Sequence, residues 1–313
     1  MDAEITPFQP ADVHCVLRLL SEAMPVDPIS ESRFVRQVLL DPNFRPEGAP
    51  VAKIGDEVMG FCLSIARQVP LENAPSDADR GYITLFAVDP KYQRQGIGSK
   101  LLAHAENYLR SHNRKLCMIS PYAPGYFTCG VDVKAYAGAV NFFAKHGYSE
   151  VYRPIAMEMA LWDFSVPAWV QEKHAKLVAD GVTVERYRSE LTLPLLEFAA
   201  KEFAGDWVRV VRETMGKIQL GETPSRIIVA HEEGRVIGYS HHDNERFGPI
   251  GVAADQRGRG IGQVLMYQTL RAQRLAGFRT AWFLWSDDKT AARIYSAAGF
   301  KEVRRFALMK KEL

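Results

Sequence analysis

The sequence predicts two copies of one α+β unit, arranged in tandem along 313 residues. A glycine-rich turn lies between a short apolar run and an amphipathic segment at 252–262, and a similar turn occurs at 88–98. Each turn is followed by a second matching stretch, at 294–300 and 142–148 respectively. Two motifs that recur in the same order indicate a duplicated domain. The length also suits two domains of ordinary size.

The first copy alternates short strands with amphipathic helices. The helices are predicted from apolar periodicity, as in Ile97, Leu101 and Ala105, and from stop residues such as Pro25. The strands are predicted from apolar runs bounded by turn residues. In chain order we expect a strand at 5–8, helices at 11–24 and 30–40, strands at 51–54, 58–65 and 82–88, a helix at 98–111, a strand at 116–120, a helix at 137–145 and a closing strand at 151–161.

The second copy repeats this order after a linker helix at 166–179 that begins at Pro167. The resulting domain boundaries are 1–163 for the first copy, 164–181 for the linker and 182–313 for the second copy. The elements predicted for the second copy are a strand at 183–187, helices at 193–203 and 207–220, strands at 227–231, 236–240 and 250–252, a helix at 262–275, a strand at 280–285, a helix at 290–298 and a closing strand at 301–310.

Bulk composition is ordinary for a soluble globular protein. The hydrophobic fraction is 47% and the charged fraction 24%, which are ordinary values. A net charge of +2 makes no case for nucleic acid or an acidic membrane as a partner. The four cysteines form no C-x-x-C pair, so we expect no metal site and a reducing compartment. No signal peptide or apolar span is evident, and we therefore expect a cytoplasmic protein.

The glycine turn of the second copy reads Arg257-Gly258-Arg259-Gly260-Ile261-Gly262. A turn with few side chains exposes backbone N–H groups at the start of a helix, where the helix dipole favours anions. The turn therefore predicts a phosphate or pyrophosphate site. It is not a dinucleotide fingerprint, because Gln263 occupies the place of the third glycine. It is not a P-loop either, because no Lys-Ser/Thr pair follows.

Both copies contain the pattern [Q/R]-x-x-G-x-G between a strand and a helix, which begins at Gln93 in the first copy and at Arg257 in the second. The stretch from Ile294 to Phe300 supplies a second motif on a short helix. In these features the chain resembles the GNAT superfamily of acyl-CoA-dependent N-acyltransferases, and the resemblance covers nearly the whole chain. It implies two tandem folds, each a central mixed, mostly antiparallel sheet flanked by helices.

The resemblance also implies acetyl-CoA as the cofactor. Loop N–H groups would bind the pyrophosphate, and the preceding strand, which bulges and diverges from its neighbour, would bind the pantetheine arm. In the second copy the matching residues are Ile250, Gly251, Val252, Arg257, Gly258, Arg259, Gly260, Ile261, Gly262 and Gln263. In the first copy they are Phe86, Ala87, Val88, Gln93, Arg94, Gln95, Gly96, Ile97, Gly98 and Ser99.

The chemistry implied is direct attack of an amine on a thioester. A base must remove a proton from the amine, and an acid assists the leaving thiolate. The family often places a tyrosine acid on the helix of the second motif, where this chain has Tyr295. For the base we select His242 and Glu245 from a polar cluster that also contains His241 and Asp243.

The first copy departs from the family pattern. Phe143 stands at the position of Tyr295 and cannot donate a proton. The strand at 82–88 carries no acidic or imidazole side chain, although its glycine loop is complete. We therefore expect the first copy to have lost or relocated catalysis. A longer segment within 121–135 contains Tyr122 and Tyr126, which would supply a replacement phenol or cover a substrate path.

The leading prediction is an acetyl-CoA-dependent N-acetyltransferase with a small-molecule primary amine as acceptor, present as a monomer or homodimer. A protein or peptide N-acetyltransferase and a non-catalytic acyl-CoA-binding or regulatory protein are the alternatives. The order of an altered and an intact copy is similar to that of tandem enzymes such as mycothiol synthase, although no residue identifies a thiol-sugar acceptor. The segments 193–220 and 240–247, which would surround the acceptor, contain no readable code for it.

Overall fold

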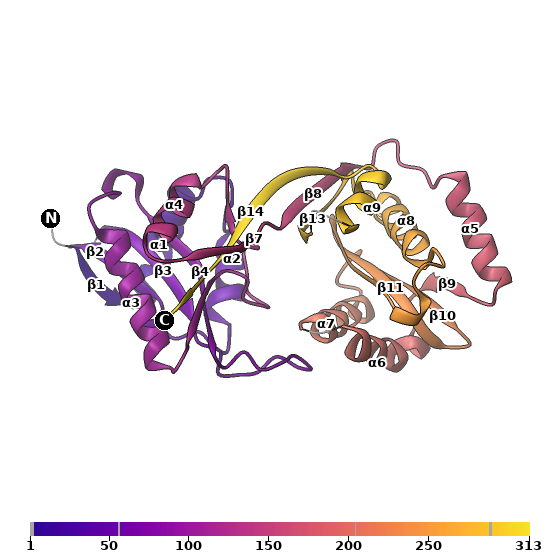
Figure 1. Ribbon diagram of the computed structural model, residues 1–313, viewed down its shortest axis with the longest axis horizontal. Helices are drawn as coiled ribbons and strands as arrows, with labels where there is room; N and C mark the ends of the chain where they lie inside the picture. Colours follow the sequence, from indigo (N-terminus) through magenta and orange to yellow (C-terminus); the bar gives the residue numbers. More distant parts are fainter. Residues whose placement is uncertain (1–2, 56, 204, 288–289) are drawn as a thin grey trace. The chain divides into compact units, whose positions relative to one another are not determined.

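The computed structural model describes residues 3–55, 57–203, 205–287 and 290–313, and the chain forms two compact units (Figure 1). The first unit contains Met1–Pro70, Ser76–Ile155 and Arg304–Leu313. The second contains Leu71–Pro75 and Ala156–Val303. Each unit thus combines segments from distant parts of the sequence, whereas the predicted boundaries follow the chain in order. Within the described residues, no helix has both the length and the apolar character needed to cross a membrane.

The first unit has a mixed sheet with strand order β1-β2-β3-β4-β5-β14. All pairs up to β4 are antiparallel, and β4 pairs parallel with β5. The short strands β6 and β7 pair with β14. The strands are β1 (Glu4–Pro7), β2 (Pro50–Ile54), β3 (Glu57–Ile65), β4 (Arg80–Val88), β5 (Leu116–Ile119), β6 (Val131–Asp132), β7 (Ser149–Tyr152) and β14 (Lys301–Glu312).

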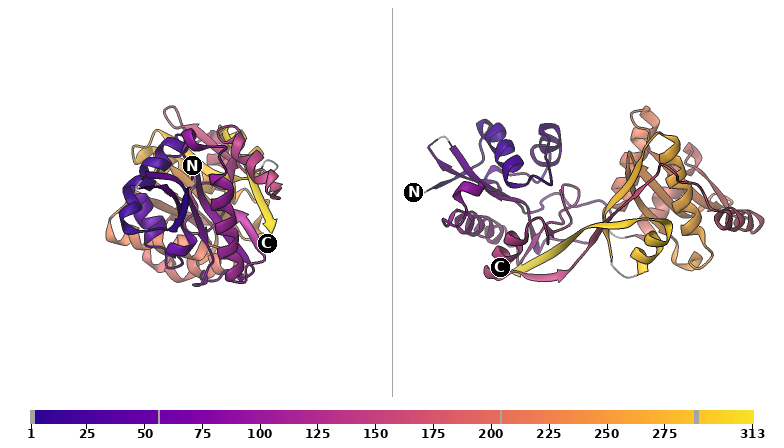
Figure 2. Two further views of the ribbon diagram at one scale, coloured as in Figure 1. Left: turned by 90° about the vertical axis from the view of Figure 1, so that its left-hand side faces the viewer. Right: turned by 90° about the horizontal axis from the view of Figure 1, so that it is seen from above.

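Helices cover both faces of this sheet (Figure 2). On one face, α1 buries Val16, Leu19 and Leu20, which are spaced as one stripe of an amphipathic helix. On the other face, α3 buries a similar stripe that includes Leu101 and Ala105. The helices are α1 (Val13–Ala23), α2 (Glu31–Phe34), which continues as a π-helical turn at Val35–Leu39, α3 (Ile97–Ser111) and α4 (Ala137–Lys145).

The second unit repeats this plan with strand order β8-β13-β12-β11-β10-β9. The helices α6 and α7 lie together on one face, over a core that includes Phe198, Val211 and Val229. The linker helix α5 packs against α8. The elements are β8 (Ile155–Ala160), α5 (Ala168–Ala179), β9 (Thr183–Arg186), α6 (Thr192–Glu202), α7 (Trp207–Leu220), β10 (Arg226–Glu232), β11 (Arg235–Asp243), β12 (Arg246–Val252), α8 (Ile261–Leu275), β13 (Thr280–Ser286) and α9 (Thr290–Ala298).

The predicted mixed, mostly antiparallel sheets with flanking helices are confirmed, but the closing strands were assigned to the wrong sheets. The strand β8 neighbours β13 in the second unit, although it follows the first copy in sequence. The end of β14 pairs with β5 in the first unit, with Met309 opposite Ile119. Apolar patterning predicts that a strand forms and which face it buries, but any free sheet edge can accept its backbone hydrogen bonds.

Candidate active site

The glycine loop of the second unit leads directly into α8. Gly258 and Gly260 have φ angles of 84° and 87°, a left-handed conformation that glycine adopts without the steric cost of a Cβ. The first helical hydrogen bond runs from Val264 N to Gly260 O, at 3.1 Å. The N–H groups before Val264 therefore lie at the start of the helix without an intrahelical acceptor, in the arrangement that favours an anion.

The first residue of the signature holds the loop in the same way in both units. Arg257 Nε donates to the carbonyl of Val252, at 3.4 Å. In the first unit, Gln93 Nε2 donates to the carbonyl of Val88, at 3.1 Å. Each side chain therefore ties the loop to the last residue of the preceding strand. This agrees with a shaping role for Arg257.

The remaining signature residues occupy the predicted loop and helix start. The guanidinium of Arg259 pairs with Glu232, at 2.7 Å, so its charge is already balanced by a carboxylate. In the first unit Gly96 has a φ of 86° and α3 begins at the next residue. The Ser99 hydroxyl lies 3.0 Å from Nε2 of His146, and Arg94 has a φ of 61°.

The strand before the loop separates from its parallel neighbour. In the second unit β12 registers with β13 only at Arg246 and Trp282, among the residues described, and β12 continues as far as Val252. The register against β11 shifts across Gly248 and Pro249, which form a bulge on β12. Bulges bend a strand and free backbone groups from the ladder. Ile250, Gly251 and Val252 follow the bulge, on the part of β12 that has left β13.

The first unit shows the same divergence. The strand β4 registers with β5 up to Ile83 and Ile119, and then continues to Val88. The register against β3 shifts at Thr84, whose hydroxyl is buried and has no hydrogen-bond partner in the described structure. Phe86, Ala87 and Val88 follow this bulge. A bulged strand that diverges from its parallel neighbour is therefore present in both units.

Tyr295 on α9 lies where the two strands of the second unit diverge. Its ring centroid is 4.5 Å from that of Phe283 on β13 and 6.1 Å from that of Phe247 on β12. Burial, together with the charge of Asp287, raises the pKa of the Tyr295 phenol to about 12. The phenol therefore remains protonated at neutral pH and is able to donate a proton.

The two candidate bases lie at the opposite end of β12 from the glycine loop. His242 is fully buried and opposite Phe247, with Nδ1 3.0 Å from the carbonyl of Asn244. Burial lowers the pKa of His242 to about 4, and its Nε2 has no partner in the described structure. Glu245 is half-buried in the turn before β12, and its carbonyl accepts the N–H of Trp282, at 3.0 Å.

His241 faces the other side of the sheet from His242. Its ring stacks with that of Tyr239 at 6.3 Å, on the face covered by α6 and α7. Burial lowers the pKa of His241 to about 3, and both its Nδ1 and the Tyr239 hydroxyl lack a partner in the described structure. On the same face, Phe203 packs against the backbone of Gly251, where a Cβ would lie 2.0 Å from the ring.

In the first unit, aromatic rings fill the position that Tyr295 has in the second. Phe143 is 2% exposed and packs against Phe86, Phe142 and Tyr148, with centroids 5.3 to 5.4 Å apart. The ring of Phe142 lies 3.4 Å from a Cβ placed on Gly98, at the start of α3. The phenol in this cluster is that of Tyr148, whose hydroxyl lies 3.1 Å from Oε1 of Glu106 and 3.2 Å from Sγ of Cys117, and the position of Tyr295 itself is occupied by the Phe143 ring.

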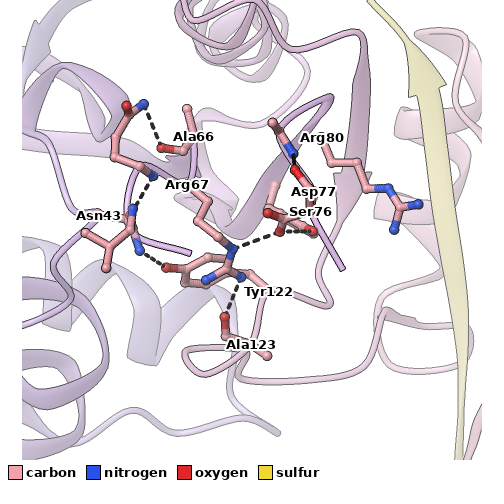
Figure 3. Close-up of polar contacts among 12 residues, drawn as sticks. Asn43, Ala66, Arg67, Ser76, Asp77, Arg80, Tyr122 and Ala123 are labelled. Carbon is pink, nitrogen blue, oxygen red and sulfur yellow. Dashed lines mark hydrogen bonds and ion pairs between the residues drawn. The ribbon is translucent and has the colours of Figure 1, made fainter. Parts of the chain in front are cut away.

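Tyr122, in the long segment after β5, belongs to a buried polar network (Figure 3). Its hydroxyl donates to Asp41 at 3.0 Å and accepts from Asn43 Nδ2 at 2.8 Å. The guanidinium of Arg67 lies 4.5 Å from the centre of the Tyr122 ring and donates to Asp77 at 2.8 Å. Burial and the charge of Asp41 raise the pKa of the Tyr122 phenol. The network positions this phenol as a structural group, which the sequence pattern did not indicate.

Two family models match the chain, the acetyltransferase (GNAT) family over residues 16–148 and the acetyltransferase (GNAT) domain over residues 223–302. The chain belongs to the GNAT acetyltransferase family. It is therefore an acyltransferase with tandem GNAT domains, and its family generally uses acetyl-CoA. No curated protein sequence matches this chain significantly.

Solved structures resemble this GNAT chain over its full length. The glucosamine N-acetyltransferase region of a fungal multi-domain GH3 β-N-acetylglucosaminidase has a TM-score of 0.81 and 20% identity, and it covers 99% of this chain and 38% of that one. A GCN5-related N-acetyltransferase from Sphaerobacter thermophilus has a TM-score of 0.70 and 18% identity, with coverage of 99% and 95%. A tandem GNAT protein of the clavulanic acid biosynthesis pathway has a TM-score of 0.67 and 19% identity, with coverage of 99% and 98%. At these identities the likeness shows the fold.

Proposed function

We propose that the second unit transfers the acetyl group of acetyl-CoA to the primary amine of a small molecule. One observation carries the proposal. The Tyr295 phenol lies against Phe247 on β12 and Phe283 on β13, next to the bulge of β12 and on the strand that leads into the glycine loop. The glycine loop, the free edge of β12 and the ring of Tyr295 on α9 therefore follow one another from one end of β12 to the other.

These features match the parts of the acetyl donor. The N–H groups around Gly260 would hold the pyrophosphate, and the free edge from Ile250 to Val252 would accept hydrogen bonds from the pantetheine arm. The bulge at Gly248 and Pro249 interrupts the ladder at the level where a thioester would end. Cofactor-binding roles in the first unit, from Phe86 to Ser99, are proposed on the same grounds.

The reaction requires proton transfers at the acceptor nitrogen and at the leaving sulfur. The amine nitrogen attacks the carbonyl carbon, the C–S bond breaks, and the thiolate sulfur takes a proton from the Tyr295 hydroxyl. The new amide nitrogen then loses its remaining excess proton, which returns to the Tyr295 phenolate and restores the phenol. The ammonium form of the acceptor must first lose a proton to a base. His242 offers an unprotonated Nε2 because its Nδ1 faces a carbonyl, but burial lowers its pKa to about 4 and it lies on the side of the sheet opposite to α6 and α7, so it is the weaker candidate. Glu245 is the other candidate, since its carboxylate belongs to the turn at the start of β12.

The acceptor is proposed to approach from the face covered by α6 and α7. This face carries the unpartnered Nδ1 of His241 and hydroxyl of Tyr239, next to the Phe203 ring that lies on Gly251. Two buried polar groups among aromatic rings are suited to orient one small amine. His241 on this face is a further candidate for a polar contact with the acceptor nitrogen.

A thiol-release assay with acetyl-CoA and a panel of amines tests the proposal. We expect acceptor-dependent release with the wild-type chain and a loss of at least about a hundredfold in kcat for Tyr295→Phe, which removes only the hydroxyl. Tyr267→Phe is the matched control, because it removes a buried phenol from α8 in the same unit. Near-normal turnover of Tyr295→Phe would overturn its role.

The same assay separates the alternative functions. Tight CoA binding without acceptor-dependent release for any amine would favour a binding or regulatory protein. Release with peptide amines alone would identify a protein or peptide N-acetyltransferase. Comparable losses for His242→Gln and Glu245→Gln would show that neither residue acts alone as the base.

A further inference from the structure

The linker helix α5 places a lysine over the glycine loop of the second unit. A Cβ placed on Gly260 would lie 2.3 Å from Cδ of Lys173, so the lysine stem covers this glycine. The ammonium of Lys173 donates to Gln263 Oε1, at 2.6 Å, in the first turn of α8. The Lys173 side chain therefore extends across the start of α8, where the family motif predicts an anion.

The positive charge of Lys173 has no carboxylate partner among the described residues that its ammonium contacts, and it lies at the start of α8. The ammonium of Lys173 contacts two neutral groups: it donates to Gln263, and it lies 5.4 Å from the centroid of the Trp169 ring. Arg259 in the same loop is already paired with Glu232. A cation beside the positive end of a helix dipole is unfavourable on its own. The negative charge of a bound phosphate would be attracted both by the Lys173 ammonium and by the positive end of the α8 dipole.

The first unit provides an internal comparison. Gly96 occupies the equivalent loop position with a φ of 86°, and among the described residues nothing lies within 4 Å of a Cβ placed there. In the second unit the cation over the loop comes from the linker helix α5.

We infer that Lys173 is a further phosphate-binding residue of the second unit. On this assignment, which depends on the proposed function, its ammonium leaves Gln263 and donates to the pyrophosphate held by the N–H groups of the Gly258–Gln263 turn. The stem stays along Gly260, and the linker helix thereby becomes part of the acyl-CoA site. Because this contact is made to the pyrophosphate, we expect it to raise the affinity for CoA, which has a pyrophosphate, and not the affinity for pantetheine, which has none.

Calorimetric titration of the full chain tests this inference with CoA and pantetheine as probes. The Gly96→Val background weakens any CoA binding by the first unit, so that the second unit dominates the signal. Lys173→Met keeps most of the stem and removes the charge, and Lys176→Met removes an exposed charge from the same helix as a control. We expect Lys173→Met to weaken CoA binding by about tenfold or more. We expect Lys176→Met to change it by less than about twofold, and pantetheine binding to be the same in both variants.

Three outcomes would count against the assignment. Unchanged or tighter CoA binding by Lys173→Met would show that the lysine covers the loop without binding the ligand. An equal loss for CoA and pantetheine would indicate a structural effect of the substitution. Absence of CoA binding by the Lys173-containing background would instead overturn the proposed function itself, so the two failures are distinguishable.

Discussion

The two units share one scaffold and differ in what lies beside it. In both, the first signature residue bonds to the last strand carbonyl, a left-handed glycine precedes the helix, and the preceding strand bulges and leaves its neighbour. At the divergence, however, the second unit has Tyr295 and the first has Phe143. Over the loop, the second has Lys173 and the first is open. The backbone geometry of a duplicated domain is thus kept in both copies, while the side chains next to it differ.

Exchanging Tyr295 and Phe143 is the most direct test of the difference between the two units. Tyr295→Phe makes the second unit match the first, and we expect kcat to fall by at least about a hundredfold, equivalent to about 2.7 kcal/mol in activation free energy. The reverse change, Phe143→Tyr, should add no comparable activity, because that ring is enclosed by Phe86, Phe142 and Tyr148. Activity restored by Phe143→Tyr in the Tyr295→Phe variant would contradict the division of roles.

Acid should destabilise the second unit because of its two buried histidines. The pKa of His241 is lowered to about 3 and that of His242 to about 4, both chiefly by burial, whereas an unfolded histidine has a pKa near 6.5. Between these values the unfolded chain binds more protons than the folded one, so stability is full above pH 6.5 and falls as the pH is lowered. We expect a loss in the free energy of unfolding at pH 5 of about 2 kcal/mol for each histidine, or about 4 kcal/mol for the two.

Tryptophan fluorescence measures this loss in the second unit alone. All five tryptophans, from Trp162 to Trp285, lie in its segment Ala156–Val303. Urea unfolding at pH 7.5 and pH 5 should therefore give different midpoints for the wild-type chain. The His241→Gln and His242→Gln double variant should show a smaller difference, and an unchanged difference would refute the assignment to these rings.

The glycine loops offer a third comparison. Gly260→Val forces a β-branched residue into a φ of 87° and also displaces the Lys173 stem, whereas Gly96→Val meets only the backbone strain. We expect CoA affinity of the second unit to fall by about tenfold, from backbone strain of 1 to 2 kcal/mol. Calorimetry with each single variant measures the two sites separately. Equal CoA binding by Gly260→Val and the wild type would remove this loop from the site.

The smallest expected effect concerns the polar network of the first unit. Tyr122→Phe removes the hydroxyl that bonds Asp41 and Asn43, and we expect about 1 kcal/mol of stability to be lost. Hydrogen exchange of amides in β4 and β5 would report this change, while tryptophan fluorescence of the second unit should stay unaltered. A shift of the tryptophan signal instead would mean that the two units do not unfold independently.

Much of each unit could be predicted from local pattern. The stripe of Ile97, Leu101 and Ala105 predicted α3, and the glycine pattern from Arg257 to Gly262 predicted the loop and the helix that follows. Such features depend on residues that are neighbours in sequence, so their spacing carries the information. The duplicated motifs likewise identified the tandem folds and the contrast between Tyr295 and Phe143.

Contacts between distant segments could be decided only by the tertiary structure. The sequence by itself determined that β8 and β14 are strands. It did not determine which strands they pair with, because backbone hydrogen bonds do not depend on side-chain identity. Their neighbours depended on which sheet edge lay free. Adjacent His241 and His242 face opposite sides of β11 because successive strand residues alternate, and only packing decides which helices cover each of them. The reach of Lys173 to Gln263 likewise depends on how α5 packs against α8, which brings together residues far apart in the chain.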